Sequence, residues 1–169
     1  MNERKTPTSP SPRELERLIS FVEAMRAEDM LYLDDVGWFH LRCYMAYEGR
    51  NPRTGDTVFV PQKTLLIFAP DHNLVSDLNG MLREDLRDPT DPDPWGTDVV
   101  IHRLDWSQPI AKYAFQALVT IGVAEIAGFG TLRVKKREVM QVAGGHRVTE
   151  KRLVWEMSEK LGTRLDATD

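Results

Sequence analysis

The spacing of apolar residues predicts an amphipathic helix from residue 13 to about residue 27. Its start is marked by Ser11, Pro12 and Glu14, which place a serine at the cap, a proline at the first helical position and a glutamate three residues after the cap. The apolar residues that share one face are Leu15, Leu18, Ile19, Val22 and Met25. Such a stripe is typical of a helix packed on a core, and it could also bind a partner helix.

Strand-like patterns follow this helix. Residues 30–33 predict a first strand that turns at Asp34 and Asp35. Residues 39–47 mix aromatic, apolar and polar side chains, and residues 57–61 alternate again, so these two runs predict a long β-hairpin. Residues 72–86 then predict a helix with inward residues Leu74, Val75, Leu78, Met81 and Leu82.

A similar order of elements is predicted for the second half of the chain. Residues 98–104 alternate like a short strand, and Ser107 and Pro109 mark a second helix start. The stripe of this helix consists of Ile110, Tyr113, Ala114, Leu118 and Ile121. Later residues predict a strand at 130–134, a hairpin turn at 143–146, a strand at 148–155 and a short helix at 157–161.

The tip of the first predicted hairpin has an unusual composition. Residues 49–56 read Gly-Arg-Asn-Pro-Arg-Thr-Gly-Asp, which combines the turn signals Asn-Pro and Thr-Gly-Asp with two arginines. Proline cannot donate to a strand ladder, so it belongs at a tip or an edge. A rigid apolar proline between cations is also suited to the minor groove of DNA, where it can prop open a base step while the arginines hold phosphates.

This run resembles the arm of the HU/IHF architectural DNA-binding proteins, which typically reads GRNPxTGxxxxIP. The similarity extends backward, because residues 35–41 (Asp-Val-Gly-Trp-Phe-His-Leu) lie where that family has GFGTFEV, with no gap up to Gly49. It extends forward to Phe68, Pro70 and Leu74, which match the closing F-x-P and the start of the last helix. The motif is specific because its flanking residues also lie at the expected distances.

The resemblance implies an α+β fold in which helices pack on antiparallel β-sheets and a β-hairpin arm protrudes. Residues 128–134 (Gly-Phe-Gly-Thr-Leu-Arg-Val) repeat the GFGTFEV element 93 residues after its first occurrence. We therefore expect two tandem HU-like repeats that form a pseudo-dimer, the second with a shorter arm. The helix that the family has before the one at residues 13–27 has no counterpart in the proline-rich leader. The expected organisation is a flexible leader at 1–12, a repeat at 13–86, an acidic linker at 87–98 and a degenerate repeat at 99–169.

The resemblance assigns the DNA contacts first of all to the arm. It implies that Pro52 is the wedge that kinks the duplex, and that the minor-groove floor or phosphates are bound by Arg50, Asn51, Arg53 and Thr54. Weaker candidates on the same hairpin are Arg42 and Lys63. The second hairpin carries seven cations that could form one patch, namely Arg133, Lys135, Lys136, Arg137, Arg147, Lys151 and Arg152. An ordinary charged strand surface is the alternative for this group.

Composition limits the remaining classes of function. The net charge is −4, although residues 107–169 carry 10 basic and 7 acidic groups, and local patches decide DNA contact more than the total does. The sequence has no apolar run long enough to span a membrane and no signal peptide, which favours the cytoplasm and, by resemblance, the nucleoid. The single cysteine, Cys43, is interpreted as a strand residue, and the four histidines lack metal-ligand spacing. We expect no catalytic site, metal or cofactor.

The leading hypothesis is therefore a bacterial or phage-type architectural protein that binds double-stranded DNA with low sequence specificity, bends it and helps to condense it. The alternative is an HU-fold protein-interaction or scaffolding module that no longer binds DNA. The net acidity and the shorter second arm favour this alternative. The two halves could pair within one chain, or two chains could form a homodimer.

Overall fold

The computed structural model describes residues 8–79, 96, 98–140, 145 and 147–167. It contains four α-helices, nine strands and one 3-10 helix in these ranges. Their bounds are α1 (Pro12–Glu23), β1 (Asp29–Leu33), β2 (Gly37–Tyr44), β3 (Tyr47–Arg50), β4 (Thr57–Val60), β5 (Lys63–Pro70), α2 (His72–Asn79), β6 (Val100–Arg103), η2 (Asp105–Ser107), α3 (Gln108–Thr120), β7 (Val123–Ile126), β8 (Gly130–Met140), β9 (Arg147–Met157) and α4 (Glu159–Asp166). An α+β fold is thereby confirmed.

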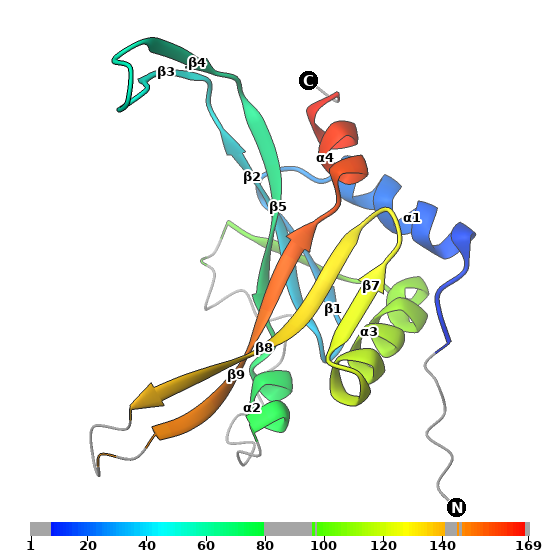
Figure 1. The fold of residues 1–169 in the computed structure, drawn as a ribbon. Helices are drawn as coiled ribbons and strands as arrows, with labels where there is room; N and C mark the ends of the chain where they lie inside the picture. The colour runs from blue at the N-terminus through cyan, green and yellow to red at the C-terminus, as the bar shows by residue number, and fades with distance from the viewer. Residues whose placement is uncertain (1–7, 80–95, 97, 141–144, 146, 168–169) are drawn as a thin grey trace, which may run out of the picture.

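The strands form three sheets. The first has the order β5-β2-β1-β6, the second consists of β3 and β4, and the third has the order β7-β8-β9. All neighbours are antiparallel except β1 and β6, which run parallel. Figure 1 shows two long hairpins, one ending in β3 and β4 and the other formed by β8 and β9, which extend away from α1 and α3.

The same order of elements occurs twice along the chain. A helix, a short strand, a long hairpin and a final helix appear as α1 to α2 and again as α3 to α4. The β1–β2 pairing of Leu33 with Gly37 has its counterpart in Ile126 with Gly130, which lies 93 residues later. The strand order and register therefore recur at the spacing of the sequence motif.

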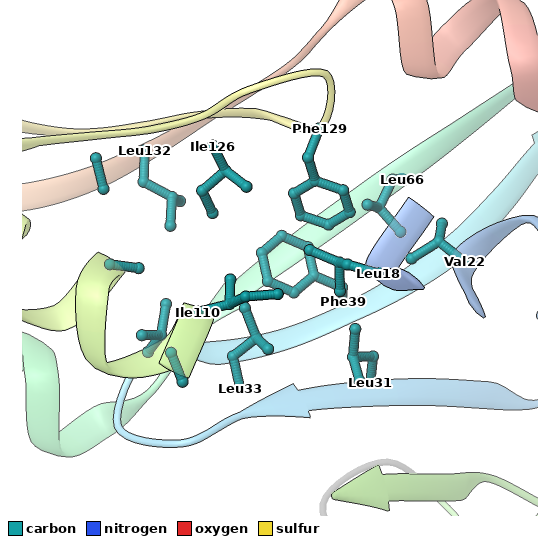
Figure 2. Close-up of a cluster of buried hydrophobic side chains, with 14 of the residues drawn as sticks. Leu18, Val22, Leu31, Leu33, Phe39, Leu66, Ile110, Ile126, Phe129 and Leu132 are labelled. Carbon is teal, nitrogen blue, oxygen red and sulfur yellow. The ribbon is translucent and has the colours of Figure 1, made fainter. Parts of the chain in front are cut away.

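One apolar core joins the two halves. Phe39 of β2 contacts Phe129, which precedes β8, at a ring-centroid distance of 5.3 Å, and it contacts Trp155 of β9 at 5.0 Å. Figure 2 shows Phe39 and Phe129 facing each other among side chains from α1, α3 and the sheets. Complete burial of Phe39 and Phe129 removes large apolar surfaces from water, which is the main stabilising contribution in such a core.

The final helix of each half packs on the sheet of the other half. α2 contacts β9, whereas α4 contacts β5. The Asn79 side chain accepts a hydrogen bond from the backbone N–H of Lys151 (2.8 Å), and Asp166 accepts one from the backbone N–H of Thr64 (3.1 Å). These two contacts occupy matching places in the two halves, so each half contributes a cap to the other.

Most of the expected elements are present, but several differ from the sequence prediction. β8 extends to Met140 rather than to residue 134, and α4 runs from Glu159 to Asp166 rather than from residue 157 to 161. The capping box at Ser11 and Glu14 is confirmed, but α1 ends at Glu23 rather than near residue 27. The expected side-chain cap at Ser107 is wrong: its hydroxyl donates to the carbonyl of Leu104, because η2 precedes α3 directly. The strand expected at residues 98–104 is present as β6, from Val100 to Arg103, but it pairs with β1 of the first half.

Several predictions concern residues outside the described part of the chain. These are the end of the helix at 80–86, most of the linker at 87–98 and most of the hairpin turn at 143–146. The start of that helix, α2, agrees with the expected position, and both strands of the second hairpin are present but longer than expected.

Candidate nucleic-acid interface

The first hairpin is built in two sections. β2 and β5 pair over eight residues, from Gly37 with Pro70 to Tyr44 with Lys63. The ladder then breaks at residues 45–46 and 61–62, where a proline without an N–H group lies, and it resumes as β3 and β4. We call residues 45–62 the arm. The break lets the arm leave the plane of the sheet, as Figure 1 shows.

Local hydrogen bonds define the arm tip. The Asn51 N–H donates to the carbonyl of Asp56 (2.9 Å), and the Gly55 N–H donates to the carbonyl of Asn51 (2.8 Å). Gly55 has a φ of 74°, a left-handed conformation that glycine adopts without steric cost. The Asn51 side-chain oxygen accepts a hydrogen bond from the Arg53 N–H (3.0 Å). Asn51 is thus a turn-forming residue, and its oxygen is already engaged in the free protein.

The tip presents the expected wedge and cations to solvent. Pro52 and its neighbours Arg50, Arg53 and Thr54 are all exposed, whereas Asn51 is half-buried. The Thr54 hydroxyl accepts from the Asp56 N–H (3.3 Å), so this side chain also supports the turn. Pro52 therefore stands at the far end of a hairpin with an arginine on each side of the Asn-Pro pair.

Arg42 and Lys63 lie together at the base of the arm. Tyr44 pairs with Lys63 across the β2–β5 ladder, and Arg42 lies two residues before Tyr44, so all three side chains project from one face. The Arg42 guanidinium lies over the Tyr44 ring at 5.2 Å from its centroid. This stacking holds a cation in place on the approach to the arm.

The cations of the second hairpin do not form a single patch. Cross-strand partners in an antiparallel ladder project from the same face, and β8 pairs Lys135 with Arg152 but Lys136 with Lys151. Lys136 and Lys151 share the face of Leu132, which is fully buried. The opposite face carries four exposed cations, which we call the cationic face: Arg133, Lys135, Arg137 and Arg152.

The expected seven-cation patch is therefore reduced to four described residues. Lys136 and Lys151 are separated from the cationic face by the sheet itself, because side chains alternate along each strand. The backbone of Arg147 pairs with that of Met140, while its side chain lies outside the described part of the structure. Three exposed carboxylates lie on the same side of the sheet as the cationic face, since Glu150 pairs with Arg137, and Glu125 and Glu156 both pair with Thr131.

The arm also carries exposed apolar side chains that are not among the site residues predicted from the sequence. The exposed fraction is 59% for Tyr47 and 67% for Phe59, and both lie within β3 and β4. Met45 and Val58 are exposed as well. The sequence contains an indication of these exposed residues. Strand-like alternation with large apolar residues continues through the arm, which lies too far from the body of the protein for these side chains to be buried.

His40 lies on β2, two residues before Arg42 on the same face. Its Nδ1 atom is buried and has no hydrogen-bond partner among the described residues. Burial and, secondarily, the charge of Arg42 lower the pKa of His40 below its usual value. The imidazole is therefore held neutral near physiological pH, and it adds no positive charge to this face of the sheet.

The described residues form neither a cluster typical of a metal site nor a membrane-spanning helix. No group of three or more histidine, cysteine, aspartate or glutamate side chains in these ranges could hold a metal ion. No described helix is long and apolar enough to cross a membrane. Cys43 is exposed, and its sulfur accepts a hydrogen bond from the Gln62 amide (3.2 Å), as expected for a strand residue at the edge of the arm.

A comparison with known protein families covers the segment that contains the exposed hairpin. Residues 16–79 match the family model of bacterial DNA-binding proteins. The matched segment is similar to HU/IHF proteins, as the sequence motif predicted, and it includes α1 from Glu16 onward, the whole arm and α2. The HU/IHF-like segment thus contains Pro52 and both flanking arginines, and it covers less than half of the chain.

Proposed function

We propose that this protein is an architectural DNA-binding protein that inserts its arm into the minor groove of duplex DNA and bends it with little sequence preference. One observation carries the proposal: Pro52 is exposed between Arg50 and Arg53 at the tip of a projecting hairpin, inside the segment that matches bacterial DNA-binding proteins. The family match supports DNA binding, and the tip geometry supports the mode of binding. Such a protein would act in the bacterial nucleoid.

The tip can act as a wedge because it is rigid and apolar. The hydrogen bonds between Asn51, Gly55 and Asp56 fix the turn, so little conformational entropy has to be lost when Pro52 enters a base step. An inserted apolar ring partly unstacks the step and kinks the duplex by about 20–90°. Arg50 and Arg53 would contact the groove or its phosphates, where they carry little sequence information.

The remainder of the arm suits the walls of the minor groove. These walls are lined by deoxyribose, which offers apolar C–H groups between the phosphates. The exposed side chains of Tyr47, Val58 and Phe59 can pack on such sugars, whereas they would be unfavourable on a surface that meets only water. We therefore assign these residues to the DNA contact together with the tip.

The two halves would form the body of the DNA-binding unit as a pseudo-dimer. Matching positions support this proposal: Asp35 and Gly128 both have left-handed backbone conformations, with φ of 60° and 74°. A Cβ atom on Gly37 would lie 2.7 Å from the Phe68 ring, and one on Gly130 would lie 2.3 Å from the Trp155 ring. Two unrelated units would not share a turn, a close approach and reciprocal helix caps.

The net charge of −4 is compatible with DNA binding because the positive and negative side chains are distributed unevenly over the helices and strands. The arm tip and the cationic face carry six arginine or lysine side chains in the described part of the chain: Arg50, Arg53, Arg133, Lys135, Arg137 and Arg152. Several carboxylates are engaged elsewhere, since Glu16 and Glu23 bind Arg164, and Asp34 binds Arg103. The alternative of a scaffolding module finds no supporting observation in the family match.

The wedge is tested by Pro52→Ala. We expect the variant to retain salt-dependent binding to a short duplex, because the arginines remain, and to lose most of the bend, measured by fluorescence energy transfer between the duplex ends. Pro12→Ala, which changes an exposed proline at the start of α1 and outside the arm, is the control and should still bend DNA. An unchanged bend in Pro52→Ala would contradict the wedge.

A further inference from the structure

We infer that each molecule introduces a single kink, at one end of its DNA contact, and that its second hairpin clamps phosphates without kinking. This inference rests on the proposed function and describes how the two hairpins divide the work. It would make the complex asymmetric although the body has matching halves.

The two hairpins share a base but differ in length. The first spans 34 residues from Gly37 to its partner Pro70, and the second spans 28 residues from Gly130 to its partner Met157. The base turns agree, because the N–H of Asp71 donates to the carbonyl of Val36 and that of Ser158 donates to the carbonyl of Phe129. The six missing residues therefore belong to the outer part of the second hairpin.

The position of the missing residues follows from the strand register. Tyr47 pairs with Val60 in the arm, and Met140 pairs with Arg147 in the second hairpin. Counted from the matching base glycines, Tyr47 and Met140 occupy the same position. Residues 48–59 of the arm therefore correspond to residues 141–146 of the second hairpin.

The sequences of these two segments differ in the chemistry that a wedge requires. Residues 48–59 contain one proline and two arginines, whereas residues 141–146 read Gln-Val-Ala-Gly-Gly-His, with no proline, arginine or lysine. A glycine pair has no ring to insert between base pairs, so this segment lacks the apolar group that a wedge requires. Kinking is thus confined to the tip at Pro52.

The described part of the second hairpin is instead suited to phosphates. At its base and middle it bears the cationic face, whereas the first hairpin has His40, Arg42 and Tyr44 at the positions of Arg133, Lys135 and Arg137, counted from the base glycines, and therefore one cation in place of three. Arginine and lysine on a strand can bind phosphates along the outside of a duplex without opening a base step. One hairpin has the properties of a wedge and the other those of a clamp.

The packing of the core leaves no place between the two halves for a second protein molecule that could supply another proline-tipped arm. Phe39, Phe129 and Trp155 fill the contact between the halves within one chain, and each final helix already packs on the opposite half. The position that a partner subunit would occupy is therefore taken by residues of the same chain. One molecule should bring one proline-tipped arm to the DNA.

The inference is tested by counting kinks on a duplex long enough for one molecule. Unstacked thymines are detected by their reactivity with permanganate, the bend by fluorescence energy transfer, and the number of bound molecules by native mass spectrometry. Wild type should give one reactive step per bound molecule, displaced from the centre of its hydroxyl-radical footprint. Two reactive steps per bound molecule would overturn the inference.

A graft provides the complementary test. Residues 141–146 are replaced by a copy of residues 48–59, which keeps the strand register of both flanking pairs. We expect a second reactive step and roughly twice the bend angle, while the same graft with alanine at the copied proline should bend DNA like wild type. A graft that binds DNA but adds no kink would contradict the assignment of kinking to the tip. Failure of the proposed function is distinguishable, because wild type itself would then give no salt-dependent binding or no kink.

Discussion

At the scale of single residues, the alternation of side chains decides which cations can meet DNA. Lys135 and Lys136 are neighbours in sequence, yet they project from opposite faces of β8. Lys135 belongs to the cationic face, whereas Lys136, although also exposed, projects from the opposite face, on which Leu132 is buried. Replacing each lysine separately therefore distinguishes the contribution of the cationic face to DNA binding from the contribution of net charge alone.

We expect Lys135→Ala to weaken DNA binding uniformly across sequences and Lys136→Ala to have a much smaller effect. The loss of one phosphate contact should reduce the slope of log K against log salt concentration by about 0.9. Fluorescence anisotropy titrations at several salt concentrations measure both slopes. Equal effects of the two substitutions would mean that only net charge matters.

At the scale of elements, α2 and α4 hold the two halves together through reciprocal caps. The Asn79 side chain accepts from the Lys151 N–H (2.8 Å) and donates to the Lys151 carbonyl (3.2 Å). Asn79→Ala leaves both half-buried backbone groups without these bonds, so we expect a loss of about 1–3 kcal/mol in the free energy of unfolding. Urea denaturation measures it, with the exposed His72→Ala on the same helix as a control expected within about 0.5 kcal/mol of wild type.

A second element-scale contact should respond to pH. The Arg103 guanidinium, bound to both carboxylate oxygens of Asp34, lowers the pKa of this group, and the Gln108 amide adds to the effect. Because the folded-state pKa lies below the unfolded one, the stabilisation is present above pH about 4 and is lost as the pH falls through the folded value. Asp34→Asn should thus differ most from wild type near neutral pH and least below the folded-state pKa of Asp34. Denaturation at a series of pH values would show this convergence, and a constant difference would contradict it.

The sequence patterns predicted which helices, turns and strands form better than they predicted which strands pair with one another. The capping box at Ser11 and the turn at Asn51 are local, so the sequence indicates them directly. The pairing of β6 with β1 joins segments about 70 residues apart, and no local pattern specifies it. The division of the second-hairpin cations between two faces required the register of β8 and β9, and the apolar arm residues were missed because strand patterns are usually interpreted as core.

At the scale of the whole molecule, one chain supplies both halves of the core. Folding is then unimolecular, so we expect the thermal unfolding midpoint to be the same at protein concentrations that differ 100-fold. Differential scanning fluorimetry at low and high concentration measures this. A midpoint that rises with concentration would show that folding depends on association between chains, and the intramolecular pseudo-dimer would be wrong.

The parallel pairing of β6 with β1 has a consequence for assembly. Edge strands with free N–H and C=O groups are templates for strand addition by other molecules. β6 occupies this position on β1, while β7, which corresponds to β1 in the second half, has no neighbour on its other side within the described part of the chain. Strand addition directly next to β1 is thereby blocked, and the edge of the sheet is transferred to β6. Because β6 and β7 are each only four residues long, both edges offer few backbone groups to another molecule.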